Sequence, residues 1–381
     1  MRQLTHGPRH HFFGRAGVSP WNASGTRLAC LECAFHDRAP QPGERASLGL
    51  VDPNTGGFSA IATTAAWSFT QGAMIEWCHQ SPNDELLFND MVDGSAIGVR
   101  LNVLTGARQV YMRPFAAAGG EGARTASVCL GRIARLGGGE GAAGAPDPFA
   151  DESAPEEDGL FAVGLTTGLQ RMIVSIASVA AEVRARHAEM RRREFWFDHV
   201  SFNPAGTRLL FTVLAGGRNA RTDSALWTIG LDGAGLREVV PFGRGATHGA
   251  WIDSGSCIAT FRGGDGPAAP RVFTDSAEPG AAACAGNITG LVRVIPSPDG
   301  AHLAIESEKS RRRSKTLTVF ERATGVATPL GELRGSDEAL FHGPSRCDLN
   351  PRWNHAGNAL CIDAVGIEAT RQLHIVSVPR A

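Results

Sequence analysis

The sequence predicts an all-β protein, a seven-bladed β-propeller of four-stranded antiparallel blades with one short inserted helix. Three observations support this fold class. A hairpin phrase recurs along the 381 residues, most copies are followed by a second hairpin, and the copies are spaced like propeller repeats. Closing the blades into a ring removes the free sheet edges that such a chain would otherwise expose.

The recurring phrase consists of an apolar stretch, Ser or Asn beside Pro or a small residue, a Gly turn and an alternating strand. The segment NPAGTRLLF at 203–211 shows this order, with Gly206 in the turn. Each copy is therefore expected to form a β-hairpin. The clearest copies are Val18–Glu32, Trp77–Asp90, His199–Leu214, His248–Phe261, Val294–Ser307 and Asn350–Val365.

A second hairpin with a Thr-Gly or Asp-Gly turn follows most copies, so that each unit has four strands. Examples are VRLNVLTGARQVY at 99–111 and LTVFERATGVATPL at 317–330. A degenerate copy around Ala126–Leu136 completes seven blades, although a count of eight stays open. We expect the closing strand at Arg371–Val378, in one blade with the N-terminal segment.

We expect one domain over residues 1–381 with two insertions. Residues 137–159 are rich in Gly, Ala and acidic residues, which is typical of an exposed loop; a calcium loop is the alternative that the carboxylates allow. Residues 176–193 contain helix formers and charge pairs four residues apart, such as Glu182 with Arg186. This second insertion predicts a surface helix.

The charge balance argues against nucleic acid and membrane partners. The chain has 37 Lys and Arg against 38 Asp and Glu, so no strong field attracts a polyanion. No segment approaches the roughly 20 apolar residues of a membrane span, and the N-terminal segment lacks the apolar stretch of a signal peptide. We therefore expect a cytoplasmic protein.

The eight cysteines are scattered, at a density far below that of a disulfide scaffold. Reduced thiols are the expected state. Cys30 and Cys33 have the spacing of zinc ligands, but the chain has no matching second pair, and on a strand their sulfurs would face opposite sides.

Aligning the copies on their turns places one residue of each at the start of the innermost strand. In a propeller these strands surround the axial channel, so we expect the aligned side chains to converge. Two histidines, an arginine and an amide in consecutive blades predict a functional site, and a hydrated channel lining is the alternative. The aligned residues are Val18, Trp77, His199, His248, Arg293 and Asn350.

The whole chain resembles the propeller proteins related to oligogalacturonate lyases and ulvan lyases, which also look like the propeller half of TolB. Relatives commonly carry histidine at the positions of four of the aligned residues, and this chain resembles a divergent member that keeps two, His199 and His248. The segments that carry the resemblance are WSFTQGAMIEW at 67–77, ELLFNDMVDG at 85–94, PDPFADE at 146–152, FDHVSFNPAGTRLLF at 197–211 and RCDLNPRWNHAGNALCID at 346–363.

The resemblance implies β-elimination on anionic oligosaccharides that contain uronates. This reaction needs a base for the C5 proton and a cation that neutralises the uronate carboxylate. His199 is the expected base, and Arg293 is the expected carboxylate ligand. Arg132, Trp77 and Asn350 are the expected substrate contacts.

The resemblance also implies a divalent metal, manganese or zinc, with His248 and His199 as its ligands. Arg293 and Asn350 stand where further histidines are expected, and the charge of Arg293 repels a divalent ion. The metal and the carboxylate-binding role of Arg293 are therefore alternatives.

Two other interpretations stay open. A propeller derived from a lyase but without catalysis would bind a carbohydrate, another small molecule or a protein. A TolB-like propeller would be a scaffold for protein partners. The sequence does not predict the oligomeric state.

Overall fold

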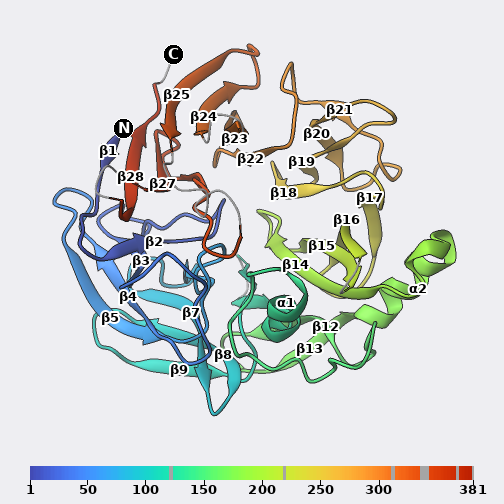
Figure 1. Cartoon of the computed structure of the whole chain (residues 1–381), viewed down its shortest axis with the longest axis horizontal. Helices are drawn as coiled ribbons and strands as arrows, with labels where there is room; N and C mark the ends of the chain where they lie inside the picture. Colours follow the sequence, from blue (N-terminus) through green and yellow to red (C-terminus); the bar gives the residue numbers. More distant parts are fainter. Residues whose placement is uncertain (120–122, 218–219, 310–313, 335–342, 366–368, 380–381) are drawn as a thin grey trace. The chain divides into compact units, whose positions relative to one another are not determined.

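The computed structural model describes residues 1–381 except 120–122, 218–219, 310–313, 335–342, 366–368 and 380–381. Its described strands form seven four-stranded antiparallel sheets (Figure 1). The predicted fold class, a seven-bladed β-propeller, is confirmed. In six sheets the strands pair in chain order, and the seventh combines strands from both ends of the chain.

The chain divides into two compact units. The first unit consists of Met1–Met112, Gly137–Ala145 and Val294–Ala381, and the second of Arg113–Leu136 and Pro146–Arg293. Four sheets belong to the first unit and three to the second, with the division falling inside one strand, β22. The expectation of one domain over residues 1–381 stays a prediction.

Three sheets of the first unit consist of two consecutive hairpins each, as the repeat predicts. The strands are β2 (His10–Phe12), β3 (Leu28–Cys33), β4 (Ala46–Val51) and β5 (Phe58–Thr64); β6 (Glu76–Trp77), β7 (Glu85–Val92), β8 (Ser95–Asn102) and β9 (Arg108–Tyr111); and β22 (Val292–Pro296), β23 (His302–Lys309), β24 (Ser314–Glu321) and β25 (Ala327–Arg334).

The fourth sheet of the first unit joins the two ends of the chain. Its order is β1 (Arg2–Gln3), β28 (Arg371–Ser377), β27 (Ala359–Val365) and β26 (Arg352–Trp353). Arg2 pairs with Ile375, and Gln3 pairs with His374. The predicted closing strand is therefore confirmed, and backbone hydrogen bonds hold the N-terminal residues to it.

The second unit contains the remaining three sheets. The degenerate copy predicted around Ala126–Leu136 lies in the first of them, although Leu130–Leu136 is a helix. The strands are β10 (Ala117–Ala118), β11 (Arg124–Ser127), β12 (Gly159–Gly164) and β13 (Gln170–Ser175); β14 (Glu194–Phe202), β15 (Arg208–Gly217), β16 (Ala220–Gly230) and β17 (Arg237–Val240); and β18 (Thr247–Trp251), β19 (Ser256–Arg262), β20 (Ala268–Thr274) and β21 (Ala283–Cys284).

Two α-helices are described, both in the second unit. The predicted surface helix is α2 (Ile176–Arg186), which begins where the Ser175 hydroxyl accepts the N–H of Ser178 at 3.1 Å, and the 3₁₀ helix η1 (Ala188–Met190) follows it. The sequence analysis did not anticipate the other helix, α1 (Leu130–Leu136). Neither is long and apolar enough to cross a membrane.

The acidic insertion is irregular from residue 137 to 158, as expected for a loop. The expectation of an exposed loop is wrong for Asp147 and Asp158, which are both buried. Asp147 Oδ2 lies 3.2 Å from Nη1 of Arg132 and 2.9 Å from Nε of Arg135, and its Oδ1 accepts the N–H of Phe149. The carboxylate of Asp147 therefore binds protein groups and does not serve a calcium loop.

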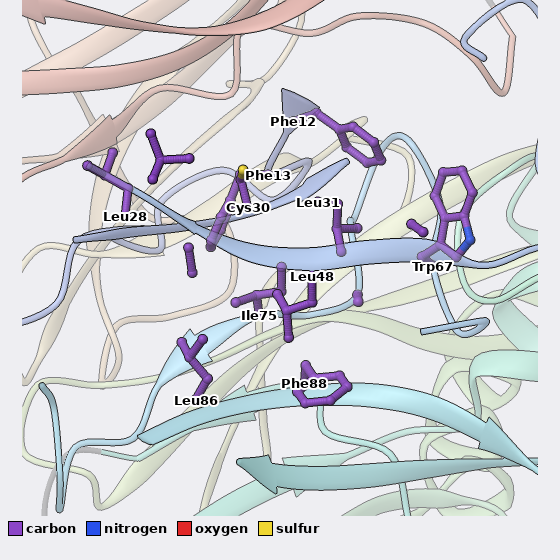
Figure 2. Packing of buried hydrophobic residues seen from close by; sticks show 14 of the residues in the cluster. Phe12, Phe13, Leu28, Cys30, Leu31, Leu48, Trp67, Ile75, Leu86 and Phe88 are labelled. Atoms are coloured by element: carbon purple, nitrogen blue, oxygen red, sulfur yellow. The ribbon is translucent and has the colours of Figure 1, made fainter. Parts of the chain in front are cut away.

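Aromatic and aliphatic side chains fill the core of the first unit (Figure 2). Both faces of β3 are buried, so Leu28, Cys30 and Leu31 all contribute to this core. Trp67 packs edge-on against Phe69 with ring centroids 5.2 Å apart. A strand buried on both faces needs apolar residues at consecutive positions, which explains why strict alternation is lost there.

All eight cysteines are free thiols, as predicted. Burial raises the pKa of the Cys33 thiol to about 11 and raises the pKa of the Cys30 thiol as well. The Cys33 thiol donates to the carbonyl oxygen of Phe35 at 2.9 Å. At neutral pH both thiols are therefore protonated.

Asp363 on β27 is the carboxylate that ties the closing sheet to its neighbour. It is 1 % exposed and accepts the backbone N–H groups of Phe13 and Gly14 at 3.2 and 3.0 Å. Its Oδ2 also lies 2.7 Å from Nη2 of Arg352, a side chain that is fully buried. Each charge of this pair is therefore neutralised by the other.

Replacing Asp363 by Asn should lower the free energy of unfolding by about 3–5 kcal/mol, because it leaves the buried guanidinium of Arg352 unpaired. The control is Glu44→Gln, which removes a carboxylate from the exposed Arg38–Glu44 pair and should change the free energy of unfolding far less. Chemical denaturation measures both. Equal losses in the two variants would contradict the structural role of Asp363.

His10 lies against the closing strand, where its Nδ1 accepts the N–H of Arg371 at 3.2 Å. Its ring stacks on the ring of His36 with centroids 4.2 Å apart. Burial, and then the neighbouring charges of His36 and Arg371, lower the pKa of His10 from 6.5 to about 4. His10 is therefore neutral in the folded protein at pH 7.

The stability of the protein should fall as the pH falls from about 6.5 to 4. In this interval His10 takes up a proton in the unfolded chain but not in the folded one, so protonation favours unfolding. His10→Asn keeps an acceptor for Arg371 and should flatten the decline. Thermal unfolding at several pH values tests this, with His187→Asn as the control, and an unchanged decline in His10→Asn would contradict it.

Candidate functional site

A bulge interrupts β14, the innermost strand of its sheet. The register shifts between Asp198 and Ser201, so that His199 and Val200 together lie opposite Phe211. His199 has a φ of +49°, in the left-handed region. A bulge of this kind redirects the side chain at that point of the strand.

The neighbouring strand β18 contains the same bulge. Its register shifts between Thr247 and Ala250, and His248 has a φ of +54°. The two strands are in contact, since Trp251 Nε1 donates to the carbonyl oxygen of Ser201 at 3.3 Å. The two predicted site histidines therefore hold equivalent bulge positions on neighbouring strands of the second unit.

Two residues of the first unit hold the same position. Met74 has a φ of +54° and lies three residues before Trp77, and Asn350 has a φ of +46° and lies three residues before Trp353. The same backbone hydrogen bond closes both bulges: Asn89 donates to Ala73 and Asp363 donates to Leu349, each at 2.9 Å. Four sheets thus share one irregularity.

The prediction that Trp77 is one of these aligned residues is wrong. Trp77 pairs with Leu86, is 5 % exposed and donates from Nε1 to the carbonyl oxygen of Pro20 at 2.8 Å. The alignment failed because the turn from Cys78 to Glu85 is two residues longer than the one from Asn203 to Arg208. Trp77 packs two sheets together, and Met74 takes the aligned position.

The left-handed backbone costs about 1–2 kcal/mol for a residue with a side chain, yet none of these four positions is a glycine. Strain that recurs at equivalent points of a fold indicates a function for the side chains that it directs. We therefore take the bulge residues of each unit as candidate functional positions of that unit. Trp77 and Trp353 lie three residues after Met74 and Asn350. Aligning the repeats on these tryptophans would have identified Met74 from the sequence.

His199 presents an accessible imidazole beside a buried carboxylate. Its side chain is 42 % exposed, and its Nε2 lies 4.0 Å from Oδ2 of Asp198, a side chain that is 1 % exposed. The other oxygen of Asp198 accepts the backbone N–H of His199 at 2.6 Å. The carboxylate of Asp198 is thus fixed beside the imidazole of His199.

Two of the predicted site residues, His248 and Arg293, contact each other. Nε of Arg293 donates to Nδ1 of His248 at 3.4 Å. Because Nδ1 accepts this bond, the neutral imidazole carries its proton on Nε2. The contact also places a permanent positive charge beside His248.

Asn350 belongs to the first unit and is 3 % exposed. Its backbone N–H and that of Leu349 donate to the two carboxylate oxygens of Glu306 at 3.1 and 2.8 Å. Glu306, on β23, is itself buried. The bulge of Asn350 is therefore held by a carboxylate from the neighbouring sheet, as Asp363 holds Phe13 and Gly14.

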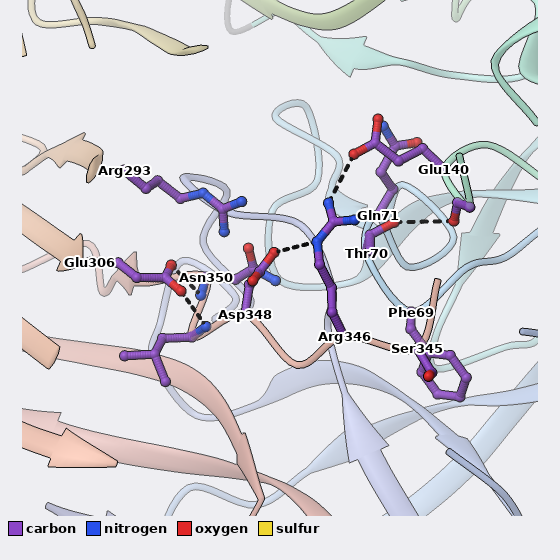
Figure 3. A network of polar contacts seen from close by, with 12 residues as sticks. Phe69, Thr70, Gln71, Glu140, Arg293, Glu306, Ser345, Arg346, Asp348 and Asn350 are labelled. Carbon is purple, nitrogen blue, oxygen red and sulfur yellow. Dashed lines mark hydrogen bonds and ion pairs between the residues drawn. The ribbon is translucent and has the colours of Figure 1, made fainter. Parts of the chain in front are cut away.

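A chain of alternating charges lies next to Asn350 in the first unit, and Figure 3 shows three of its members, Asp348, Arg346 and Glu140. Oδ1 of Asp348 is 2.5 Å from Nζ of Lys315, and Oδ2 of Asp348 is 3.0 Å from Nε of Arg346. Nη2 of Arg346 lies 3.2 Å from Oε1 of Glu140. We call Lys315, Asp348, Arg346 and Glu140 the Arg346 cluster.

The sequence analysis missed the Arg346 cluster, although the sequence contains one signal for it. Only two of the 37 basic residues are lysines, and one of these, Lys315, is 4 % exposed. Lysine is rarely buried without an ionic partner. A lone lysine in the apolar pattern of a strand, in a chain that otherwise uses arginine, therefore indicates a specific pairing.

Arg132, a predicted substrate contact, instead holds the acidic insertion in place. It is 1 % exposed, and its Nε donates to the carbonyl oxygen of Phe195 at 2.7 Å. Its two other nitrogens donate to Asp147, Phe149, Glu152 and Ser153. All five N–H groups of the guanidinium are thus engaged by the protein, which leaves none for a substrate carboxylate.

The predicted metal ligand His248 does not fit a divalent ion. His199 and His248 offer imidazole nitrogens, but the guanidinium of Arg293 occupies Nδ1 of His248 and repels a second cation. In the first unit, both oxygens of Asp348 bind Lys315 and Arg346, and burial raises the pKa of the Cys347 thiol. These groups are engaged as partners of cations or as neutral thiol.

No protein-family model matches the chain, and no curated protein sequence matches it. Solved structures do. An oligogalacturonate lyase from Vibrio parahaemolyticus matches with a TM-score of 0.67 and 13 % identity over 99 % of this chain and 93 % of that one. The chain shares the fold of oligogalacturonate lyase. The resemblance predicted from the sequence is therefore confirmed for the fold.

Two further structures have the same fold. An oligogalacturonate lyase in complex with manganese matches with a TM-score of 0.66 and 15 % identity, over 99 % of this chain and 93 % of that one. A puromycin hydrolase mutant matches with a TM-score of 0.55 and 14 % identity, over 96 % of this chain but 55 % of that one. At these identities the likeness extends to the fold and not to the activity.

The left-handed backbone of His199 leads to a prediction on stability. His199→Val should lower the free energy of unfolding by about 1–2 kcal/mol, because a β-branched side chain fits the left-handed region poorly, whereas His199→Asn should change it little. Chemical denaturation measures both, with Ser201→Val on the same strand as the control. Equal stability of the Val and Asn variants would contradict strain at this bulge.

Proposed function

We propose that this protein binds anionic oligosaccharides that contain uronates and cleaves them by β-elimination without a divalent metal. The observation that carries the proposal is the group in the second unit: an exposed imidazole, His199, on the strand next to His248 and its contact with Arg293. The fold shared with oligogalacturonate lyase over nearly the whole chain supports it.

Each residue of this group has a role in the reaction. A bidentate contact from Arg293 neutralises the uronate carboxylate and so acidifies the proton on C5. His199 takes that proton, the C4–O4 bond breaks, and a C4–C5 double bond forms. The imidazolium of His199, which lies beside Asp198, then holds a proton that returns to the leaving O4 or to water. His248 keeps Arg293 in place through Nδ1.

The manganese of the similar lyase has no counterpart in this proposal, because the guanidinium of Arg293 supplies the positive charge in its place. A divalent ion, manganese or zinc, would have to displace Arg293 from His248 before His248 and His199 could bind it. The reaction should therefore proceed in the presence of a chelator. The cytoplasmic location stays a proposal that rests on the sequence alone.

A second function, binding without turnover, is favoured by one observation. Asn350 holds the bulge position equivalent to His199, but its carboxamide does not exchange protons at neutral pH and its side chain is buried. In the first unit this position therefore supplies no acid or base. A propeller with fewer proton-transfer groups than the reaction needs would still bind the same anionic sugar through Arg293.

The proposal is tested by following ultraviolet absorbance of the unsaturated uronate while oligogalacturonate is incubated with the protein and a chelator. His199→Ala should lower kcat by about 100- to 10,000-fold. Arg293→Gln should lower kcat/KM by about 100-fold or more, and Arg293→Lys should retain part of it, because charge is kept and the bidentate contact is lost.

The matched control is His187→Ala, the same substitution at another histidine of the second unit, and it should leave turnover unchanged. Full turnover in His199→Ala would exclude His199 as the base. Loss of turnover on addition of the chelator would contradict the metal-free reaction. Binding with no product in the unmodified protein would favour the second function.

A further inference from the structure

The Arg346 cluster holds one edge of a guanidinium in a fixed position. Lys315 on β24 is buried, and its ammonium contacts Oδ1 of Asp348 at 2.5 Å, which keeps that carboxylate ionised and oriented. Oδ2 of Asp348 then accepts from Nε of Arg346 at 3.0 Å. The arrangement leaves the Nη2 side of Arg346 directed away from Asp348 (Figure 3).

A carboxylate of the chain already meets this side of Arg346. Oε1 of Glu140 lies 3.2 Å from Nη2 of Arg346, and the two side chains are 16 % and 28 % exposed. The pair is therefore open to solvent in part. A guanidinium binds any carboxylate of suitable position through the same donors, whether it belongs to the chain or to a ligand.

Glu140 is presented by a loop that is fixed on both sides of it. The Thr70 hydroxyl donates to the carbonyl oxygen of Gly139 at 3.4 Å, and the N–H of Gly141 donates to Oε1 of Gln71 at 3.1 Å. This loop, Gly137–Ala145, belongs to the first unit although the chain on either side of it belongs to the second. A rotation of the Glu140 side chain alone would release Arg346 without moving the loop backbone.

We propose that Arg346 is a second carboxylate-binding subsite, in which Glu140 occupies the place of a ligand carboxylate until the ligand displaces it. This inference rests on the proposed function, since the ligand is the same class of anionic oligosaccharide. Exchanging one carboxylate for another keeps the guanidinium of Arg346 paired, and the displaced carboxylate of Glu140 turns to solvent. Glu140 thereby competes with the ligand for Arg346. Only a ligand that binds Arg346 more strongly than Glu140 does will displace it.

The test is the affinity for oligogalacturonate, measured by isothermal titration calorimetry on the full chain with His199→Ala present in every variant, so that the ligand is not cleaved during the titration. Glu140→Gln removes the internal competitor and should tighten binding about fivefold, the factor that corresponds to about 1 kcal/mol for a partly exposed ion pair. Arg346→Gln should weaken binding. In the Arg346→Gln background the further change Glu140→Gln should tighten binding much less than it does when Arg346 is present, because Arg346 is no longer there to be released.

The matched control is Glu44→Gln, which removes one carboxylate from another arginine pair of the first unit and should leave the affinity unchanged. Thermal unfolding of every variant establishes that it is folded. Unchanged or weaker binding by folded Glu140→Gln would overturn the subsite. Tightening of the same size in the Arg346→Gln background would also overturn it, since the effect would then be one of net charge.

The two proposals fail in different ways. Product formation by the unmodified protein together with an unchanged affinity in Glu140→Gln would overturn the subsite and keep the lyase. Tightening in Glu140→Gln without any product from the unmodified protein would keep the subsite and overturn the lyase. Absence of binding both with and without Glu140→Gln would overturn the subsite for this class of ligand.

Discussion

The structure depends on one constraint. Where a bulge interrupts the pairing of a strand with its neighbour, the backbone N–H groups need another acceptor. A buried N–H without a partner costs about 1–3 kcal/mol. Carboxylates meet this need: Glu306 binds the N–H groups of Leu349 and Asn350, and Asp198 binds that of His199. The same groups also place fixed negative charge beside the bulges that they hold.

Fixed negative charge explains why cations of the protein gather at these strands. Lys315 and Arg346 neutralise Asp348, and Arg352 neutralises Asp363. Each pair is buried wholly or in part, so its members are tied to their positions by the cost of leaving a charge unpaired. A propeller built in this way holds positive charge on its own side chains.

The fold shared with oligogalacturonate lyase at 13–15 % identity follows from the same reasoning. A blade requires four short strands, turn residues and apolar packing positions, and many sequences supply these. At the bulges the fold requires only a residue that tolerates a left-handed backbone. The residues that do so here are Met74, His199, His248 and Asn350. Chemistry can therefore change at these positions while the backbone stays the same.

The sequence by itself determined the blades, the closing strand at Arg371–Val378, the helix within 176–193 and the positions of His199 and His248, because turn residues and strand patterns are local signals. Tertiary structure alone decided the rest. In the structure Trp77 packs between two sheets, and Arg132 binds the acidic insertion. Met74 holds the aligned position. Whether a polar side chain faces a site or pairs inside the protein depends on partners far away in the chain, which no local pattern encodes.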